Sequence, residues 1–306
     1  MDTTLLVQMT FGALLALSVY LPLACGQLSL ATPGFYAIGG YVAALLSTRV
    51  PALAGSGPLY PLPSLLLEML LGALIAGGLA LAIGGQVLRL RGIYLAIATI
   101  ALVEILRVLV LNLPFLGGAV GIFGIPQPFA DPAGYLLTAL LLLALTGWLI
   151  ERLSRLRFGR ALAAIRDDEL AAVCMGIDAQ RVKLVSFVIS AVVAGATGAL
   201  AAHFLNTWNA RQGTFDASIT TLAFVVFGGS RTWIGPVLGG LVLTALPELL
   251  RPLGDIRLIV FGLVILIGPV FAPQGLITPE RLHAMRRLLL RRLAPLLPGR
   301  RRGLQP

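Results

Sequence analysis

Few residues of this sequence could do chemistry, and two of them stand inside an apolar run. Glu104 and Arg107 interrupt YLAIATIALVEILRVLVLN at i, i+3 spacing, which places both on one face of a helix. Counted from Ile93 at about 1.5 Å per residue, Glu104 lies about 16 Å into a hydrocarbon layer of about 30 Å. Both groups must then face protein or water rather than lipid. We expect either a structural ion pair or a charged position in a pathway or its gate.

The other reactive residue types are too few for the common catalytic sites. Lys183 is the only lysine, which excludes a GxxxxGK[ST] phosphate loop, so energy must come from another chain or from a gradient. His203 and His283 are the only histidines, which excludes HExxH zinc chemistry. Cys25 and Cys174 have no metal or redox spacing. We expect no catalytic residue, no metal and no cofactor, with His203 in a capping or interfacial role and His283 solvated.

These residues must be positioned by elements that cross a membrane. The 306 residues are 58% hydrophobic and 12% charged, with a mean hydropathy of +0.94, which is too apolar for a soluble domain. The apolar runs are continuous rather than alternating, so they predict helices and not a barrel. We predict an all-α polytopic membrane protein with about nine transmembrane helices, in a range of 8–10. The expected spans lie near residues 4–24, 28–48, 63–88, 93–113, 133–151, 183–205, 217–230, 233–250 and 257–273.

The one long polar interval runs from residue 151 to residue 183. Asp167 or Asp168 can cap the N-terminus of a short helix there, and Gly176 is a typical helix stop. The helix would carry an apolar stripe of Leu170, Val173, Cys174 and Ile177. We predict a loop at residues 152–182 within a transmembrane domain of residues 1–280, followed by a basic tail at residues 281–306. The pattern alone leaves open a solvated connector or a partner-docking surface.

The distribution of charge orients the chain. If the polar loop is cytoplasmic, alternation of the spans places the N-terminus outside and the C-terminus inside. Of the 23 basic residues, 18 then lie inside and 4 outside, in accord with the positive-inside rule. The four outside residues are Arg49, Arg211, Arg251 and Arg257. The basic tail therefore indicates contact with anionic membrane lipid rather than with nucleic acid.

Two glycine-rich segments interrupt the apolar pattern. LSLATPGFYAIGGYVAALLST carries Gly39 and Gly40, and SITTLAFVVFGGSRTWIGPVLGG carries Gly228 and Gly229. In the first segment, small residues let neighbouring helices approach, or the helix is broken near its middle. The two segments run in opposite directions, as an inverted repeat around a central pathway would leave them. The four glycines are therefore candidate pathway or gate positions, together with the charged pair above.

The string FGRALAAIRDDELAAVCMGIDAQRVKLVSFVISAVVAGATGAL closely resembles the cytoplasmic loop and following span of branched-chain amino-acid ABC transporter permeases, in their LivM-like branch. GQLSLATPGFYAIGGYVAAL, RLRGIYLAIATIALVEILR and FVVFGGSRTWIGPVLGGLVLTALPELLR resemble further spans of that family, so the resemblance covers about residues 20–276. LATPGF departs from it, because family members commonly carry a glycine and a histidine after the serine-leucine. A role of that histidine is therefore in doubt here.

The resemblance implies a permease subunit of an ABC importer for branched-chain or similar amino acids, without enzymatic activity of its own. The working unit would contain a second related permease, two ABC ATPase subunits and an extracytoplasmic solute-binding protein, in the bacterial inner membrane. In the family the loop presents a short helix to a cleft of the ATPase. The resemblance also implies that coupling between ATP hydrolysis and transport depends on six loop residues: Arg166, Asp168, Glu169, Ala171, Ala172 and Gly176. Gly176 lies one position later than the glycine of the general importer motif.

Three other functions stay open on the sequence. An ABC permease for urea or short amides would share these motifs. A gradient-driven secondary transporter of a small polar solute usually carries several acidic groups at membrane depth, whereas here only Glu104 is deep, and Glu68 and Glu248 lie nearer the ends of their spans. A structural subunit would have no pathway of its own. Copurification with an ATPase subunit separates these classes.

Overall fold

The structure is a computed structural model, and it describes residues 2–50, 53, 60–254, 256–271 and 275. Within this part, each of the nine predicted spans coincides with one helix. These are α1 (Thr3–Leu23), α2 (Thr32–Arg49), α3 (Leu62–Val87), α4 (Ile93–Asn112), α5 (Pro132–Arg155), α8 (Ala179–Leu205), α9 (Phe215–Gly228), α10 (Ile234–Leu249) and α11 (Ile256–Phe271). The all-α fold is therefore confirmed, and the predicted tail at residues 281–306 lies outside the described residues.

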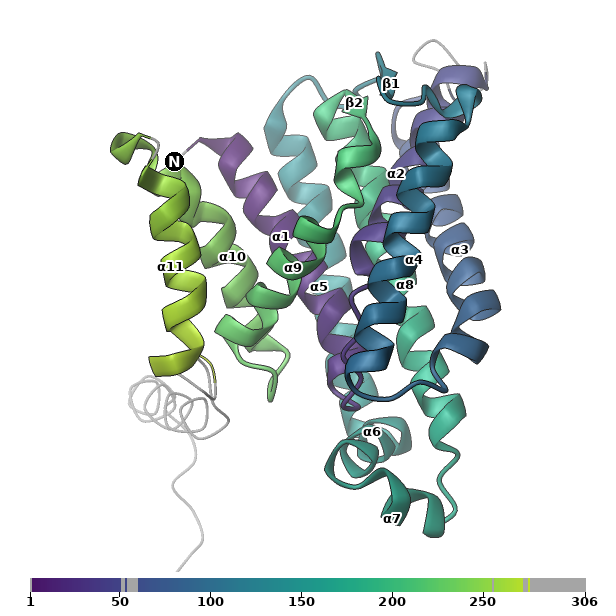
Figure 1. The fold of residues 1–306 in the computed structure, drawn as a ribbon. Helices are drawn as coiled ribbons and strands as arrows, with labels where there is room; N and C mark the ends of the chain where they lie inside the picture. The colour runs from purple at the N-terminus through teal and green to yellow at the C-terminus, as the bar shows by residue number, and fades with distance from the viewer. Residues whose placement is uncertain (1, 51–52, 54–59, 255, 272–274, 276–306) are drawn as a thin grey trace, which may run out of the picture.

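The remaining elements are short, and most of them lie at the two ends of the helix bundle. At one end, β1 (Ile122–Phe123) pairs antiparallel with β2 (Thr207–Trp208). At the opposite end, α6 (Arg157–Asp167) and α7 (Glu169–Cys174) project below the bundle (Figure 1). Three 3-10 turns complete the described chain: η1 (Pro114–Leu116), η2 (Ala210–Gln212) and η3 (Arg251–Leu253).

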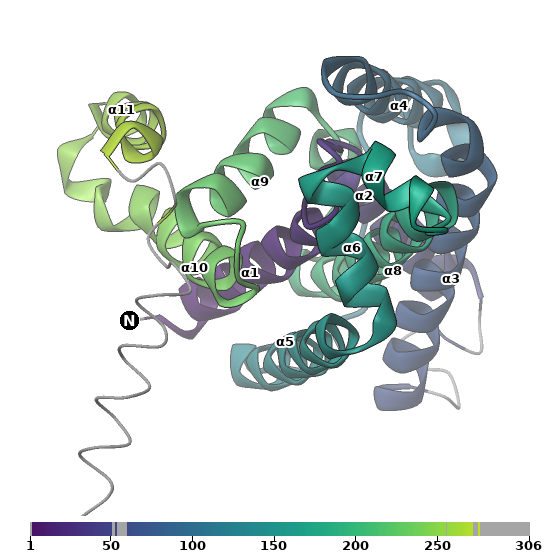
Figure 2. The same cartoon turned by 90° about the horizontal axis from the view of Figure 1, so that it is seen from below.

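Helix α8 forms the centre of the bundle. Of its most apolar 18-residue window, 72% is buried, compared with 28% for α4 and for α5. Helices α2 and α3 pack along α8, and α1 connects this group to α9 and α10 (Figure 2). By length and composition, α1, α3, α4, α5 and α8 are each suited to cross a membrane. The apolar faces that α3, α4 and α5 leave exposed fit a lipid surrounding.

Helix α2 is not broken at its glycines, which corrects one of the two alternatives for this segment. It begins at Thr32 rather than near residue 28, because residues 27–31 are non-helical and Pro33 fits the first helical turn. From there α2 is continuous through Gly39 and Gly40. A Cβ atom at Gly39 would collide with the carbonyl of Gly195 on α8. The small residues therefore allow α2 and α8 to approach closely.

The second glycine-rich segment does contain an interruption. Helix α9 ends at Gly228 because Gly229 has a φ of 107°, a conformation that L side chains rarely adopt. A Cβ at Gly228 would collide with the carbonyl of Gly235, so the glycines also let α9 and α10 pack closely. With 14 residues, α9 is about 21 Å long, shorter than a hydrocarbon layer of about 30 Å. The inverted repeat stays a prediction.

The chain re-enters the bundle between α8 and α9. The Trp208 Nε1–H donates to the Ala37 carbonyl over 3.0 Å, and Gly213 packs against Pro33 and Ala37, so residues 208–213 follow the first half of α2. This segment contains Arg211, which the alternation of spans had placed in an outside loop. The structure instead places Arg211 beside a membrane helix.

Candidate functional site

The polar loop contains two helices rather than the single one expected. Helix α6 was missed, although Phe158, Leu162 and Ile165 carry the i, i+4, i+7 spacing that could have revealed it. Asp168 rather than Asp167 caps α7, because its Oδ1 accepts from the backbone N–H groups of residues 170 and 171 at 2.9 and 3.1 Å. Gly176 stops the turn that follows α7 with a φ of 83°. The loop is thus a compact pair of capped helices.

Most of the predicted apolar stripe on α7 faces outward. Leu170 and Val173 are 67% and 52% exposed, and Cys174 is also exposed, whereas Ile177 is partly buried against a small cluster. Met175, which was not part of the predicted stripe, is 82% exposed. Ala172 faces the other way, is 4% exposed, and packs in a small cluster with Ile165 and Ala179. Helix α7 is therefore anchored through one small residue and presents its larger apolar side chains outside the bundle.

Glu169 ties this loop to the bundle. Its carboxylate pairs with Lys183 of α8 at 2.8 Å and with Arg91, just before α4, at 3.4 Å. Lys183 is largely buried, so Glu169 provides the countercharge that its burial requires. On the other side, the backbone of Arg166 packs against Gly26, in the segment that joins α1 to α2. The loop therefore contacts the bundle on two sides.

Glu104 and Arg107 form the ion pair that their spacing predicts. The Arg107 Nε lies 2.6 Å from the Glu104 Oε2, and the side chains are 36% and 38% exposed, respectively. Arg107 also lines an apolar pocket of about 200 Å³ between α2, α4 and η2. A pair this exposed at membrane depth is not shielded from lipid by this chain alone. Whether its role is structural or in a pathway stays a prediction.

Three of the four candidate glycines have packing positions, and the fourth, Gly229, ends α9. Gly39 meets the α8 backbone, Gly40 meets the Trp208 indole, and Gly228 meets α10. Cavities of about 380, 250, 240 and 200 Å³ in the described structure are not lined by any of the four. Their role as pathway or gate positions stays a prediction.

A cleft of about 380 Å³ lies elsewhere, between α1, α2, α9 and α10. The end of α8 and the re-entrant segment also contribute to it through Phe204, Arg211 and Gln212. Arg211 is the one charged side chain in the lining of this cleft. The sequence predicted no site here, because Arg211 was assigned to the outside.

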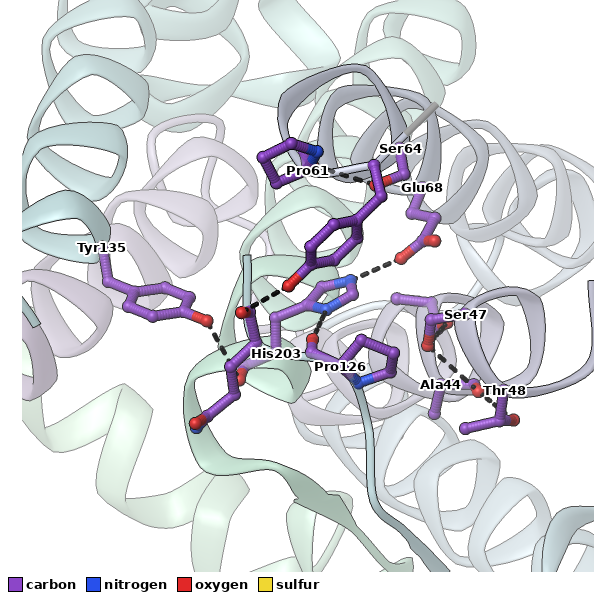
Figure 3. Close-up of polar contacts among 12 residues, drawn as sticks. Ala44, Ser47, Thr48, Pro61, Ser64, Glu68, Pro126, Tyr135 and His203 are labelled. Atoms are coloured by element: carbon purple, nitrogen blue, oxygen red, sulfur yellow. Dashed lines mark hydrogen bonds and ion pairs between the residues drawn. The ribbon is translucent and has the colours of Figure 1, made fainter. Parts of the chain in front are cut away.

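A second contact between ionisable side chains, in this case buried ones, joins Glu68 of α3 to His203 of α8 (Figure 3). Glu68 is fully buried, and His203 is nearly so. The His203 Nδ1 must carry a proton, because it lies 2.8 Å from the Pro126 carbonyl, which can only accept. The Nε2 then shares a further proton with the Glu68 carboxyl. His203 therefore connects α3, α8 and the loop that contains β1. The sequence predicted only a capping or interfacial role for it.

Within the described residues there is no group of three or more His, Cys, Asp or Glu side chains that could hold a metal ion.

Comparison with known proteins gives one family. The family model described as "Branched-chain amino acid transport system / permease component" matches residues 2–268. The high-affinity branched-chain amino acid transport system permease protein LivM of Escherichia coli (strain K12) is 34% identical over 286 residues, which cover 84% of this chain and 65% of that protein. This chain thus spans slightly less than two thirds of that relative's length.

Two further relatives are also permease proteins of transport systems. The high-affinity branched-chain amino acid transport system permease protein LivH of Salmonella typhimurium (strain LT2) is 36% identical over 109 residues, 36% of this chain and 34% of that protein. The D-allose transport system permease protein AlsC of Escherichia coli (strain K12) is 25% identical over 258 residues, 79% of this chain and 72% of that protein. No solved structure gives a significant match.

Proposed function

The chain belongs to the family of branched-chain amino acid transport system permease components, and we propose that it forms part of the translocation pathway of an ABC importer. The proposed substrates are leucine, isoleucine, valine or similar amino acids, and ATP is hydrolysed by separate chains. The proposed partners are a second related permease, two ABC ATPase subunits and an extracytoplasmic solute-binding protein, in the bacterial inner membrane.

The observation that carries this proposal is the helix pair α6–α7. Leu170, Val173 and Met175 form an exposed apolar surface on a short, capped helix that projects from the bundle. Exposed apolar groups of this kind mark the surface at which a protein docks with its partner. An ATPase subunit that closes on α7 would move it as a lever, and the ion pair of Glu169 with Lys183 would pass that movement to α8.

The need for a second permease is supported by Glu104 and Arg107. Their exposed pair lies on α4, at the edge of the bundle (Figure 2). Lipid solvates a charged pair at this depth poorly, and the insertion cost of a lone charge is about 2.5–3.5 kcal/mol. A second subunit packed over α4, or a water-filled pathway between the two subunits, removes that cost.

Copurification and reconstitution test this function. We expect the tagged chain to retain an ABC ATPase subunit in mild detergent. Proteoliposomes that hold this complex should take up labelled leucine when the binding protein and ATP are both supplied. Replacing the phosphate-loop lysine of the copurified ATPase by alanine is the matched control, and it should abolish uptake. Uptake that needs no ATP and follows an imposed ion gradient would instead establish a secondary transporter.

We also infer that the N-terminus lies outside, with the strand-bearing loop, and that α7 and the C-terminal tail are cytoplasmic. Phe123→Cys and Met175→Cys place single exposed thiols at the two ends of the bundle. Native Cys174 is exposed and must be replaced by alanine, as must Cys25, although burial raises the pKa of the Cys25 thiol to about 11. In sealed cells a membrane-impermeant maleimide should label only the position 123 variant. The opposite labelling pattern would reverse the orientation.

A further inference from the structure

If the hydrocarbon layer begins at Ile93, where α4 starts, the re-entrant segment between α8 and α9 reaches the middle of that layer. The Leu30 N–H donates to the Thr99 hydroxyl over 3.0 Å, which places the start of α2 beside a residue about 9 Å along α4. Gly213 packs on Ala37, five residues further along α2. That position is about 16 Å deep in a layer of about 30 Å. Arg211 and Gln212 of η2 are adjacent to it in the chain.

Non-helical backbone is tolerated at this depth only where it is buried in protein or lines an aqueous cavity. The segment meets this condition in two ways. Trp208 is fully buried between α2 and α8, and it fills the space that Gly40 leaves open. Arg211 and Gln212, by contrast, line the cleft of about 380 Å³. The cleft is therefore part of the reason that the chain leaves the helical conformation here.

The lining of the cleft combines two chemistries. Its walls are apolar and aromatic, formed by Phe11, Leu15, Tyr36, Phe204, Leu205 and Phe224. Between them lie uncharged polar side chains: Gln8, Gln212, Thr220, Thr221 and Thr244. The Thr244 hydroxyl is buried and has no hydrogen-bond partner within the described part of the chain. A cavity that binds nothing does not require polar side chains in its lining, whereas a binding site for an amphipathic solute uses both polar and apolar side chains.

Arg211 supplies the charge of this cleft. Among the described residues, no carboxylate lies within 4.0 Å of its guanidinium, in contrast to Arg107 and Arg251, which are both paired. An arginine left without a counterion at this depth is costly, and its planar fork fits a carboxylate bidentately. Helix α9 starts beside it at Phe215 and carries Asp216 in its first turn, but within the described residues Asp216 forms no ion pair with Arg211.

We propose that this cleft is a substrate-binding site within the membrane, and that it takes solutes with a carboxylate and an aliphatic side chain. Arg211 binds the carboxylate, and the aromatic walls enclose the aliphatic part. The inference rests on the proposed import function, and it adds the place of the binding site in the fold and the residue that binds the carboxylate. The volume lies within the range of about 300–1,000 Å³ that is typical of small-molecule sites.

The test uses the purified complex with its copurified partners. Millimolar leucine should raise the Tm of the wild-type complex, and leucinamide, which lacks the carboxylate, should not. Arg211→Gln should abolish the leucine-dependent shift and lower leucine uptake tenfold or more, and Arg211→Lys should retain part of both. Arg251→Gln is the matched control, because Arg251 pairs with Glu248 on the surface, outside the cleft. It should behave like the wild type.

A second variant keeps the proposal testable if Arg211→Gln does not assemble. Thr220→Phe fills the cleft with an apolar ring, and it should block uptake without removing a charge. Wild-type uptake and a wild-type Tm shift in either variant would overturn the site. The proposed function fails separately, when the wild-type complex imports no leucine. Import of an uncharged amide in place of leucine would overturn the solute class proposed here.

Discussion

A proline at position 172 tests whether α7 acts as a rigid lever. The Ala172 N–H donates to the Asp168 carbonyl over 3.0 Å, a bond in the first turn of α7. Proline removes that donor, and its ring clashes with the same carbonyl, at a cost of about 3 kcal/mol. At about 1.4 kcal/mol per factor of ten, Ala172→Pro lowers the population of the helical form about 100-fold.

The damage should stay within the loop. Helix α7 packs mainly on α6 and on the start of α8, and Ala172 belongs to a small cluster separate from the bundle core. We therefore expect Ala172→Pro to leave the membrane helices folded and the complex assembled. Uptake of leucine in proteoliposomes should fall at least tenfold, because movement of the ATPase no longer reaches α8.

The assay pairs uptake with ATP hydrolysis and with size-exclusion chromatography of the same preparation. Ala172→Ser is the matched control, because it keeps the backbone N–H and nearly the same volume, and its uptake should stay within about twofold of the wild type. Normal uptake by a well-assembled Ala172→Pro complex would refute the lever. Equal losses in the serine and proline variants would assign the effect to packing instead of to the helix.

Three further changes test the membrane part. Glu104→Gln should reduce assembly if the pair is structural, since Arg107 is left unpaired at depth, and should alter uptake with normal assembly if it lines a pathway; wild-type behaviour in both assays contradicts both roles. Glu68→Leu and His203→Leu should each lower the free energy of unfolding by about 3–5 kcal/mol, because each leaves a buried partner unpaired. The double variant should recover part of the loss in Tm. Additive losses in the double variant would contradict the coupling of the two residues. Gly39→Ala forces a Cβ into the α8 backbone and should cost about 1–3 kcal/mol, so an unchanged Tm would rule out the close helix contact.

The sequence was sufficient for features that depend on local spacing. Continuous apolar runs predicted nine helices of the described chain, five of which are long and apolar enough to cross a membrane, since runs without alternation do not form a barrel. The i, i+3 spacing of Glu104 and Arg107 predicted their ion pair, because helix geometry alone brings them together. Asp168 was one of two candidates for the cap of α7, and the structure selects it.

Features that depend on contacts distant in sequence were missed. The residues of the Glu68–His203 contact are 135 positions apart, and only the shared level of their spans pointed to it. Arg211 was assigned to the outside because counting alternate spans assumes that every connection stays at the surface. A chain that turns back along α2 violates that assumption, and Gly40 and Trp208 are complementary only in the folded bundle.

The loop and the cleft are connected through the segment that joins α1 to α2. The backbone of Arg166 on α6 packs against Gly26, whose φ of 77° marks a turn that is not part of either helix. The segment leads directly into Pro33 and Tyr36, which line the cleft. At its other end, the Ser186 hydroxyl of α8 donates to the Leu21 carbonyl over 2.7 Å and fixes the end of α1. Because α8 contacts the end of α1 while α6 contacts the turn, we propose that a displacement of the loop moves α2 relative to α1 and changes the width of the cleft between them.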